Sequence, residues 1–140
     1  MRFLLDTDVV LDFVLEREPF VGDARALFEL IAAGAHEGYV SVITPVNVFY
    51  IGRKARGDVA TKQAIRDLLD AVRVCPVDQN VLNIALASPI ADYEDAVQHA
   101  SAAAIRLEAI VTRNVGDYRN AALPIFTPAD LLNHLKRPQS

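Results

Sequence analysis

The sequence predicts an α/β domain with a parallel sheet and helices on both of its faces. Short apolar segments rich in β-branched and aromatic residues alternate with amphipathic helical segments from end to end. The chain has 140 residues, the size of a single domain with one well-buried core. No repeat, low-complexity segment or linker interrupts the alternation. Regular alternation of this kind is typical of parallel sheets.

The expected strands are short and apolar, as strands buried on both faces are. They cover residues 2–6, 39–43, 73–77, 109–112 and 124–126. We expect one domain over 1–135 and a frayed tail over 136–140.

Start and stop signals delimit the helices between these strands. An apolar stripe over 24–31 is followed by Gly34, where a glycine just past a helix end belongs. Thr44 and Pro45 predict an N-cap and the first helical position. Gly57 is expected to end that helix.

Three further helices are expected in the second half of the chain, the first of them capped by Asp78. The longest runs from about Asp92 to Leu107, with mainly alanines, including Ala103 and Ala104, facing inward. Thr127 opens the last helix.

Composition excludes several classes of protein. A hydrophobic content of 52% with 23% charged residues indicates a globular chain. The net charge of −4 argues against a general nucleic-acid coat protein, but not against an enzyme with a local basic patch such as Arg53, Lys54 and Arg56. The alternative is that this patch is a solvated helix face. One cysteine excludes a disulfide framework or a thiolate zinc site.

The chain has no apolar stretch long enough to span a membrane and no recognisable signal peptide. We therefore expect a cytoplasmic protein that makes no use of a membrane.

Polar residues follow three of the expected strands. In a parallel sheet such residues gather at one edge, where open α/β folds bind ligands. They are Asp6 and Asp8 after the first strand, Asn47 after the second, and Asn114 and Asp117 after the fourth.

The helix that carries Asp92, Glu94 and Asp95 begins after a loop that can reach the same edge. Clustered carboxylates repel one another unless a cation lies between them. Ligands that are all oxygen favour Mg²⁺ or Mn²⁺ over zinc, and such ions activate water and neutralise charge on a phosphodiester.

Each of these residues also has a purely structural interpretation. Asp6 is a suitable N-cap for a short helix, although we favour the functional role. For Asp92 we favour the cap, which places Asp95 in the first turn, where a helix welcomes an anion. Asn47 stands where a capping-box partner of Thr44 would lie.

Glu94 and Asp12 are expected to face solvent. The spacing of the three histidines matches no metal signature.

Three segments together resemble the PIN domain family. They are FLLDTDVVLD over 3–12, whose family pattern is written hhhDTNxhhD, EDAVQ over 94–98, and IVTRNVGDY over 110–118. With the strand–helix order, the resemblance covers essentially the whole chain. It implies a three-layer α/β/α sandwich with a mostly parallel sheet of four to five strands. It also implies a metal-dependent ribonuclease, often the toxin of a VapC-type toxin–antitoxin pair.

The resemblance carries over residue by residue. Asp6 and Asp95 match the two acids most consistently assigned to the metal, and Asp117 matches the acid that precedes an aromatic residue. Asn114 stands where many members have an aspartate, and Asn47 where most have a glutamate. Each asparagine removes a negative charge from the site, which should weaken metal binding.

The first hypothesis is a Mg²⁺- or Mn²⁺-dependent endoribonuclease. Asp6, Asp95 and Asp117 would hold the metal, with Asn47 and Asn114 as further catalytic-site residues. The candidate substrate-binding residues are Thr7, Arg53, Lys54, Thr112 and Arg113; the basic ones would hold the RNA backbone. The resemblance adds two protein partners, a second copy in a homodimer and a cognate antitoxin.

Two other hypotheses remain. The neutral Asn47 and Asn114 suggest a catalytically weakened PIN module that binds RNA or a protein without cleaving. The order Leu5-Asp6-Thr7-Asp8 also suggests a phosphotransfer enzyme of the haloacid-dehalogenase type, in which Asp6 would be the nucleophile. That family needs a downstream lysine, and after Lys62 the next lysine is Lys136.

Overall fold

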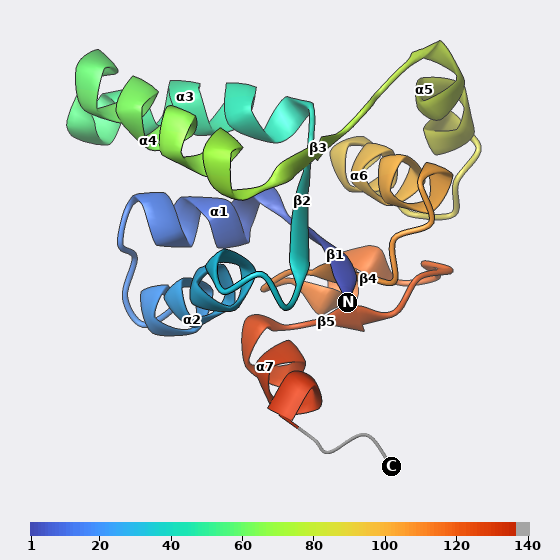
Figure 1. The fold of residues 1–140 in the computed structure, drawn as a ribbon. Helices are drawn as coiled ribbons and strands as arrows, with labels where there is room; N and C mark the ends of the chain where they lie inside the picture. Colours follow the sequence, from blue (N-terminus) through green and yellow to red (C-terminus); the bar gives the residue numbers. More distant parts are fainter. Residues whose placement is uncertain (137–140) are drawn as a thin grey trace.

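Five parallel strands form the central sheet of the computed structural model, which describes residues 1–136 (Figure 1). The strands are β1 (Arg2–Leu5), β2 (Glu37–Ser41), β3 (Arg73–Cys75), β4 (Ala109–Val111) and β5 (Ile125–Phe126). The helices are α1 (Thr7–Val14), α2 (Val21–Ala32), α3 (Ile43–Arg56), α4 (Asp58–Ala71), α5 (Gln79–Leu86), α6 (Tyr93–Ala104) and α7 (Pro128–Lys136). A short 3₁₀ helix, η1 (Val115–Tyr118), follows β4.

The strand order is β3-β2-β1-β4-β5, so β1 lies at the centre. Leu4 pairs with Tyr39 of β2 on one side and with Ile110 of β4 on the other. The chain first builds outward from β1 to β3 and then returns to the opposite side of β1. The direction of building therefore reverses between β1 and β4, and this switch point is where open α/β sheets bind ligands.

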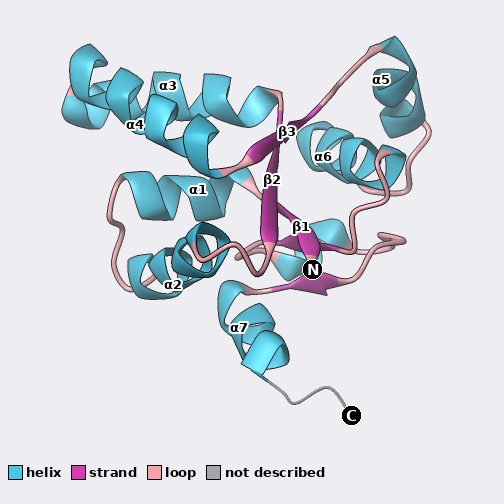
Figure 2. Ribbon diagram, viewed as in Figure 1, coloured by secondary structure: helices cyan, strands magenta, loops and turns pink. Residues whose placement is uncertain are grey.

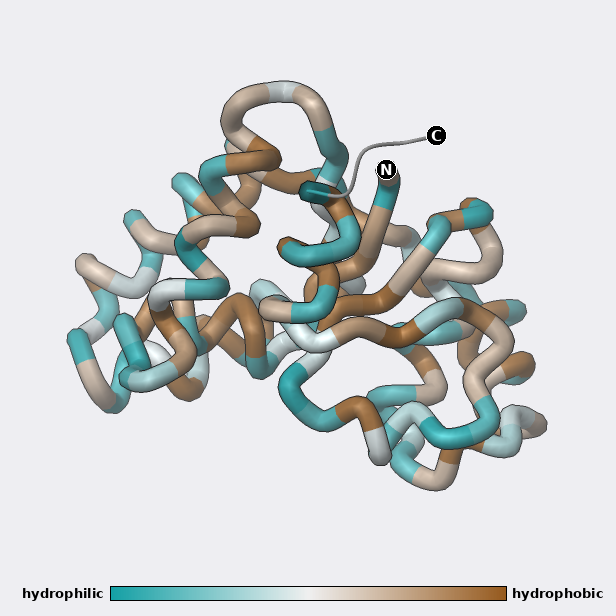
Figure 3. Tube along the Cα trace, turned by 90° about the horizontal axis from the view of Figure 1, so that it is seen from below, coloured by the Kyte–Doolittle hydropathy of each residue, from teal (hydrophilic) through white to brown (hydrophobic). Residues whose placement is uncertain are grey.

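Helices cover both faces of the sheet (Figure 2). Along β1, Phe3 and Leu5 belong to the apolar core shared with α1 and α2, whereas Leu4 belongs to the core shared with α5 and α6. This alternation follows from the two-residue period of a strand. Apolar segments run through the middle of the molecule (Figure 3). The predicted α/β/α sandwich is confirmed, with five strands, all parallel.

The expected strands are all present, and Gly34 follows α2 with a φ of 84°, as predicted. The predicted start of α3 is wrong by two residues. The helix begins at Ile43 and Val42 is its N-cap. Thr44 instead turns its hydroxyl to that of Thr7, 2.9 Å away, which joins α3 to α1 inside the protein.

The predicted end of α6 is also wrong, because the helix stops at Ala104. Arg106 has a φ of 58°, a left-handed conformation that a helix cannot continue. Ala103 and Ala104 are exposed, and a side chain that the sequence analysis did not place inside, Gln98, is buried instead.

The last helix begins after Thr127, as expected, with the Thr127 hydroxyl accepting a hydrogen bond from the backbone N–H of Asp130 at 3.1 Å. It reaches Lys136, and the rest of the expected tail, 137–140, lies outside the described residues. The division at residue 135 remains a prediction. Within residues 1–136, no helix combines the length and apolar character needed to cross a membrane.

Candidate functional site

Asp6 lies at the carboxyl end of β1, at the switch point of the sheet. Its backbone N–H continues the pairing with β4 by donating to Val111 O at 2.9 Å. The residue occupies the N-cap position of α1, yet its side chain makes no capping hydrogen bond. The structural alternative for Asp6 therefore does not account for its carboxylate.

The Asp6 carboxylate instead accepts hydrogen bonds from three side chains. Gln98 Nε2 donates to Oδ1 at 2.9 Å. Thr112 Oγ1 donates to Oδ2 at 2.8 Å, and the Tyr118 hydroxyl donates to the same oxygen at 3.2 Å. These donors come from α6, from the end of β4 and from η1. Sequence reasoning missed Gln98 and Tyr118; the available signal for Gln98 was its position three residues after Asp95, on the same side of α6.

Asp6 is only 7% exposed. Across residues 1–136, the ion pairs closer than 4.0 Å do not include Asp6. Removing a carboxylate from water without a counter-charge is unfavourable, and neutral donors offset only part of this cost. The site is therefore short of positive charge.

Asp8 ties the segment after β4 to the start of α1. Its Oδ2 accepts hydrogen bonds from Arg113 N at 3.2 Å and Asn114 Nδ2 at 2.9 Å. Its Oδ1 is buried and has no hydrogen-bond partner among the described residues. Burial, and then the negative charge of Asp6, raise the pKa of Asp8 to about 6.

The N-terminus of α6 adds further acids to this edge. Asp92 caps the helix, as predicted, by accepting a hydrogen bond from the backbone N–H of Asp95 at 3.0 Å. Burial raises the pKa of Asp95 to about 7, with the charges of Asp6, Asp92, Asp117 and Glu94 acting in the same direction. Asp95 and Asp117 therefore lie in the same electrostatic site as Asp6.

Both asparagines hold an acid of the same edge. Asn47 Nδ2 donates to Glu94 Oε1 at 2.8 Å, and Asn114 Nδ2 donates to Asp8 Oδ2. Glu94 is exposed, as expected, but its hydrogen bond with Asn47 keeps it at the site. Burial raises the pKa of Glu94, and the negative charges of Asp92 and Asp6 act in the same direction.

The expectation for Asp12 is wrong. Its side chain is 1% exposed and lies 2.6 Å from Arg113 Nε and 4.0 Å from Arg17 Nη1. The Arg113 guanidinium also lies over the ring of Phe20, 4.0 Å from its centroid. Asp12 lies on the buried face of α1. The sequence alone does not show that an arginine from the end of β4 contacts it there.

The five predicted substrate-binding residues fall into two groups, three with partners inside the protein and two on an exposed helix face. Thr7, Thr112 and Arg113 direct their side chains to partners inside the protein. Arg53 and Lys54 are exposed in the C-terminal part of α3, and Arg53 pairs with Asp58 at 3.6 Å.

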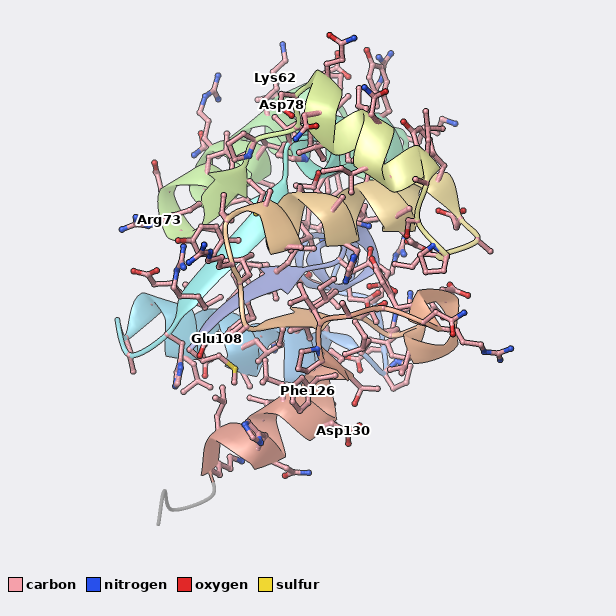
Figure 4. The ribbon with its side chains drawn as sticks, turned by 90° about the vertical axis from the view of Figure 1, so that its right-hand side faces the viewer. Lys62, Arg73, Asp78, Glu108, Phe126 and Asp130 are labelled. Carbon is pink, nitrogen blue, oxygen red and sulfur yellow. The ribbon has the colours of Figure 1, made fainter. Side chains whose placement is uncertain are left out.

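On the neighbouring helix α4, Lys62 lies at the outer edge of the molecule, far from the sheet (Figure 4).

The donor set at the edge fits a hard divalent cation by its chemistry. Carboxylate and amide oxygens are the ligands of Mg²⁺ and Mn²⁺, and Asp8 Oδ1 is a buried oxygen that no group in the described part of the chain donates to. Within residues 1–136, no three His, Cys, Asp or Glu side chains already surround one point as ligands do. We therefore expect the carboxylates to turn before they close around an ion.

The fold and this edge define an α/β protein with an acidic site at the switch point of a parallel sheet. A family model described as PIN domain matches residues 2–116. The chain therefore belongs to the PIN domain family, which confirms the resemblance seen in the sequence. No curated protein matches the chain.

Solved structures share the fold at low sequence identity. A toxin–antitoxin complex from Klebsiella pneumoniae has a TM-score of 0.69 at 24% identity, covering 89% of this chain and 96% of the other. DNA-bound VapBC from Salmonella typhimurium has a TM-score of 0.69 at 17% identity, covering 91% and 98%. A sarcin-ricin loop cleaving toxin from Mycobacterium tuberculosis has a TM-score of 0.63 at 16% identity, covering 77% and 86%.

Proposed function

We propose that this protein is a Mg²⁺- or Mn²⁺-dependent endoribonuclease that hydrolyses RNA phosphodiester bonds. The observation that carries the proposal is Asp6, a buried carboxylate at the switch point with no cation beside it in residues 1–136 and with Asp8 and Asp95 in its field. Membership of the PIN domain family supports it.

Asp6, Asp95 and Asp117 are the residues that would hold the ion, and Asp8 and Glu94 add carboxylates beside them. Such an ion supplies positive charge against a phosphodiester and makes water a better nucleophile. The protein itself provides the acids, holds Asp6 through three donors and keeps the surroundings of Asp6 largely free of water.

A pocket of about 320 Å³ beside Asp117 offers a place for the RNA backbone. Asp92 and Asp117 line it together with Arg119. A phosphate needs positive charge rather than base readout, and Arg119 supplies that charge next to the acids.

The two asparagines do not leave the edge without charge. Asn47 holds the carboxylate of Glu94 and Asn114 holds that of Asp8, so an acid stands beside each neutral residue. This pairing favours the nuclease over the weakened binding module.

We further propose that the protein is a cytoplasmic toxin that forms a homodimer and is inhibited by a cognate antitoxin. The names of the structures with the same fold, among them VapBC complexes, support this assignment.

The test is cleavage of a mixed RNA pool with Mn²⁺, with Mg²⁺ or with EDTA. We expect the wild type to cut with either ion and not with EDTA, and Asp6→Asn and Asp95→Asn to lose at least about 100-fold of the rate. Asp70→Asn, at an exposed position of α4, is the matched control and should cut like the wild type. A wild type inactive with both ions, or equal activity in all four proteins, would contradict the proposal.

A further inference from the structure

Gln98 is an unusual residue for its position. It is 1% exposed in α6, a helix whose other buried residues are mostly apolar, among them Ala96, Val97 and Ala100. Its Oε1 is buried and has no hydrogen-bond partner in residues 1–136. Leaving such an oxygen unpaired costs about 1–3 kcal/mol, so its retention calls for an explanation.

The amide nitrogen of the same side chain supplies one. Gln98 Nε2 donates one hydrogen to Asp6 Oδ1 at 2.9 Å and the other to the Tyr118 hydroxyl oxygen at 3.2 Å. Tyr118 has a single hydroxyl hydrogen and donates it to Asp6 Oδ2. The three groups form a closed ring of hydrogen bonds.

The direction of this ring is set by the charge of Asp6. Turning the amide over would place Oε1 against Asp6 Oδ1, two acceptors facing each other, and would leave the tyrosine oxygen without a donor. Only the observed orientation of the amide gives hydrogen bonds to both the Asp6 carboxylate and the tyrosine oxygen. The same orientation leaves Oε1 without a partner among the described residues. The unpaired oxygen is therefore a consequence of directing both amide hydrogens to the site.

We propose that Gln98 and Tyr118 are positioning residues that hold the Asp6 carboxylate in one orientation for the cation and the reaction. The inference rests on the proposed function and deepens it. Gln98 is held in place by α6, and Tyr118, which is 2% exposed, is held by η1. Side chains from two separate elements therefore donate hydrogen bonds to the two oxygens of one carboxylate. Fixed orientation matters because groups that orient metal-binding side chains control both metal affinity and rate.

Two variants remove the ring of hydrogen bonds with little change in volume. Tyr118→Phe removes only the hydroxyl, and Gln98→Met replaces the amide by an apolar group of similar length. Tyr39→Phe is the matched control, because Tyr39 is also buried (5% exposed) and its hydroxyl bonds to Arg2 and Glu37 instead of the site.

Two quantities would be measured for each protein. The first is the Kd for Mn²⁺ in the absence of RNA, from the electron paramagnetic resonance signal of the free ion. The second is kcat and KM on one RNA oligonucleotide. We expect Tyr118→Phe and Gln98→Met to raise the Kd roughly 10-fold and to lower kcat by a similar factor. KM for RNA should change by less than about 2-fold, and Tyr39→Phe should behave as the wild type.

Values within about 2-fold of the wild type in both variants would overturn the inference while leaving the proposed function intact. A wild type that neither binds Mn²⁺ nor cuts RNA would overturn both. Should Gln98→Met fail to fold, Tyr118→Phe alone decides, because it keeps the aromatic side chain and its packing.

Discussion

Two buried aspartates on the same stretch of chain are treated in opposite ways. Asp12, 1% exposed, lies against Arg113 at 2.6 Å and near Arg17. Asp6, 7% exposed, receives three hydrogen bonds from neutral side chains, and no cation within residues 1–136 pairs with it. Asp12 therefore has a cationic partner among the described residues, whereas Asp6 has only neutral donors.

Arg113 connects the two aspartates. Its guanidinium pairs with Asp12, and its backbone N–H donates to Asp8, the neighbour of Asp6 in the site. The charge that stabilises α1 therefore also anchors the segment that follows β4. A buried ion pair fixes a position at some expense of desolvation, whereas an unpaired acid keeps its charge available to a ligand.

The comparison predicts that the same substitution has a large effect on stability at Asp12 and a small one at Asp6. Asp12→Asn leaves Arg113 partly buried without its partner and should lower the free energy of unfolding by about 3 kcal/mol, or Tm by about 10 °C. Asp6→Asn removes an unpaired buried charge at the expense of one hydrogen bond and should change it by no more than about 1 kcal/mol. Thermal unfolding in EDTA measures both.

The pair itself is tested by adding Arg113→Met to Asp12→Asn. If the ion pair is the cause, the double variant should be more stable than the sum of the two single losses predicts. Equal Tm values for Asp6→Asn and Asp12→Asn would refute the distinction between the two aspartates.

Adding a carboxylate at position 47 should make the site around Asp6 more negative and increase its affinity for a cation. Asn47→Glu places a second negative charge next to Glu94, so we expect Mn²⁺ to bind roughly 10-fold more tightly, equivalent to about 1.4 kcal/mol. The increase in Tm on adding Mn²⁺ should grow accordingly. Glu94→Gln should have the opposite effect, and an unchanged response to Mn²⁺ in both would show that this pair lies outside the ion's reach.

The smallest expected effect concerns pH in the metal-free protein. The pKa of Asp95 is raised to about 7 in the folded state. An unfolded aspartate has a pKa of about 3.9, so the folded state holds a proton that the unfolded state releases in between. Asp95 therefore makes stability fall as pH rises from about 4 to about 7.

Asp95→Asn removes this dependence. In EDTA the variant should be more stable than the wild type at pH 8, by on the order of 1 kcal/mol because solvent screens a partly exposed group, and equal to it near pH 4. A variant less stable than the wild type at pH 8 would contradict the shift.

The parts of the fold that depend on local pattern could be predicted from the sequence. Each expected strand is present, because short β-branched runs between helices leave little choice of conformation. The N-cap at Asp92 and the glycine after α2 were likewise local signals. The ends of α3 and α6 were not, since Thr44 is bound by Thr7 and Arg106 takes a left-handed conformation.

The acids of the candidate site were also visible in the sequence, because each follows a strand or opens a helix. Their surroundings were not. Burial of Asp12, its meeting with Arg113, and the ring of hydrogen bonds from Gln98 and Tyr118 join residues distant in the chain. Local periodicity carries no information about such contacts.

The sequence by itself determined the α/β class, the parallel strands and the acids at their ends, because hydrophobic period and strand ends are properties of neighbouring residues. Only the tertiary structure decided that β4 returns to lie against β1, which creates the switch point beside Asp6. It also decided which buried carboxylate receives a cation from the protein and which receives only neutral donors. Those outcomes depend on long-range packing, where burial and the distance between charges are set.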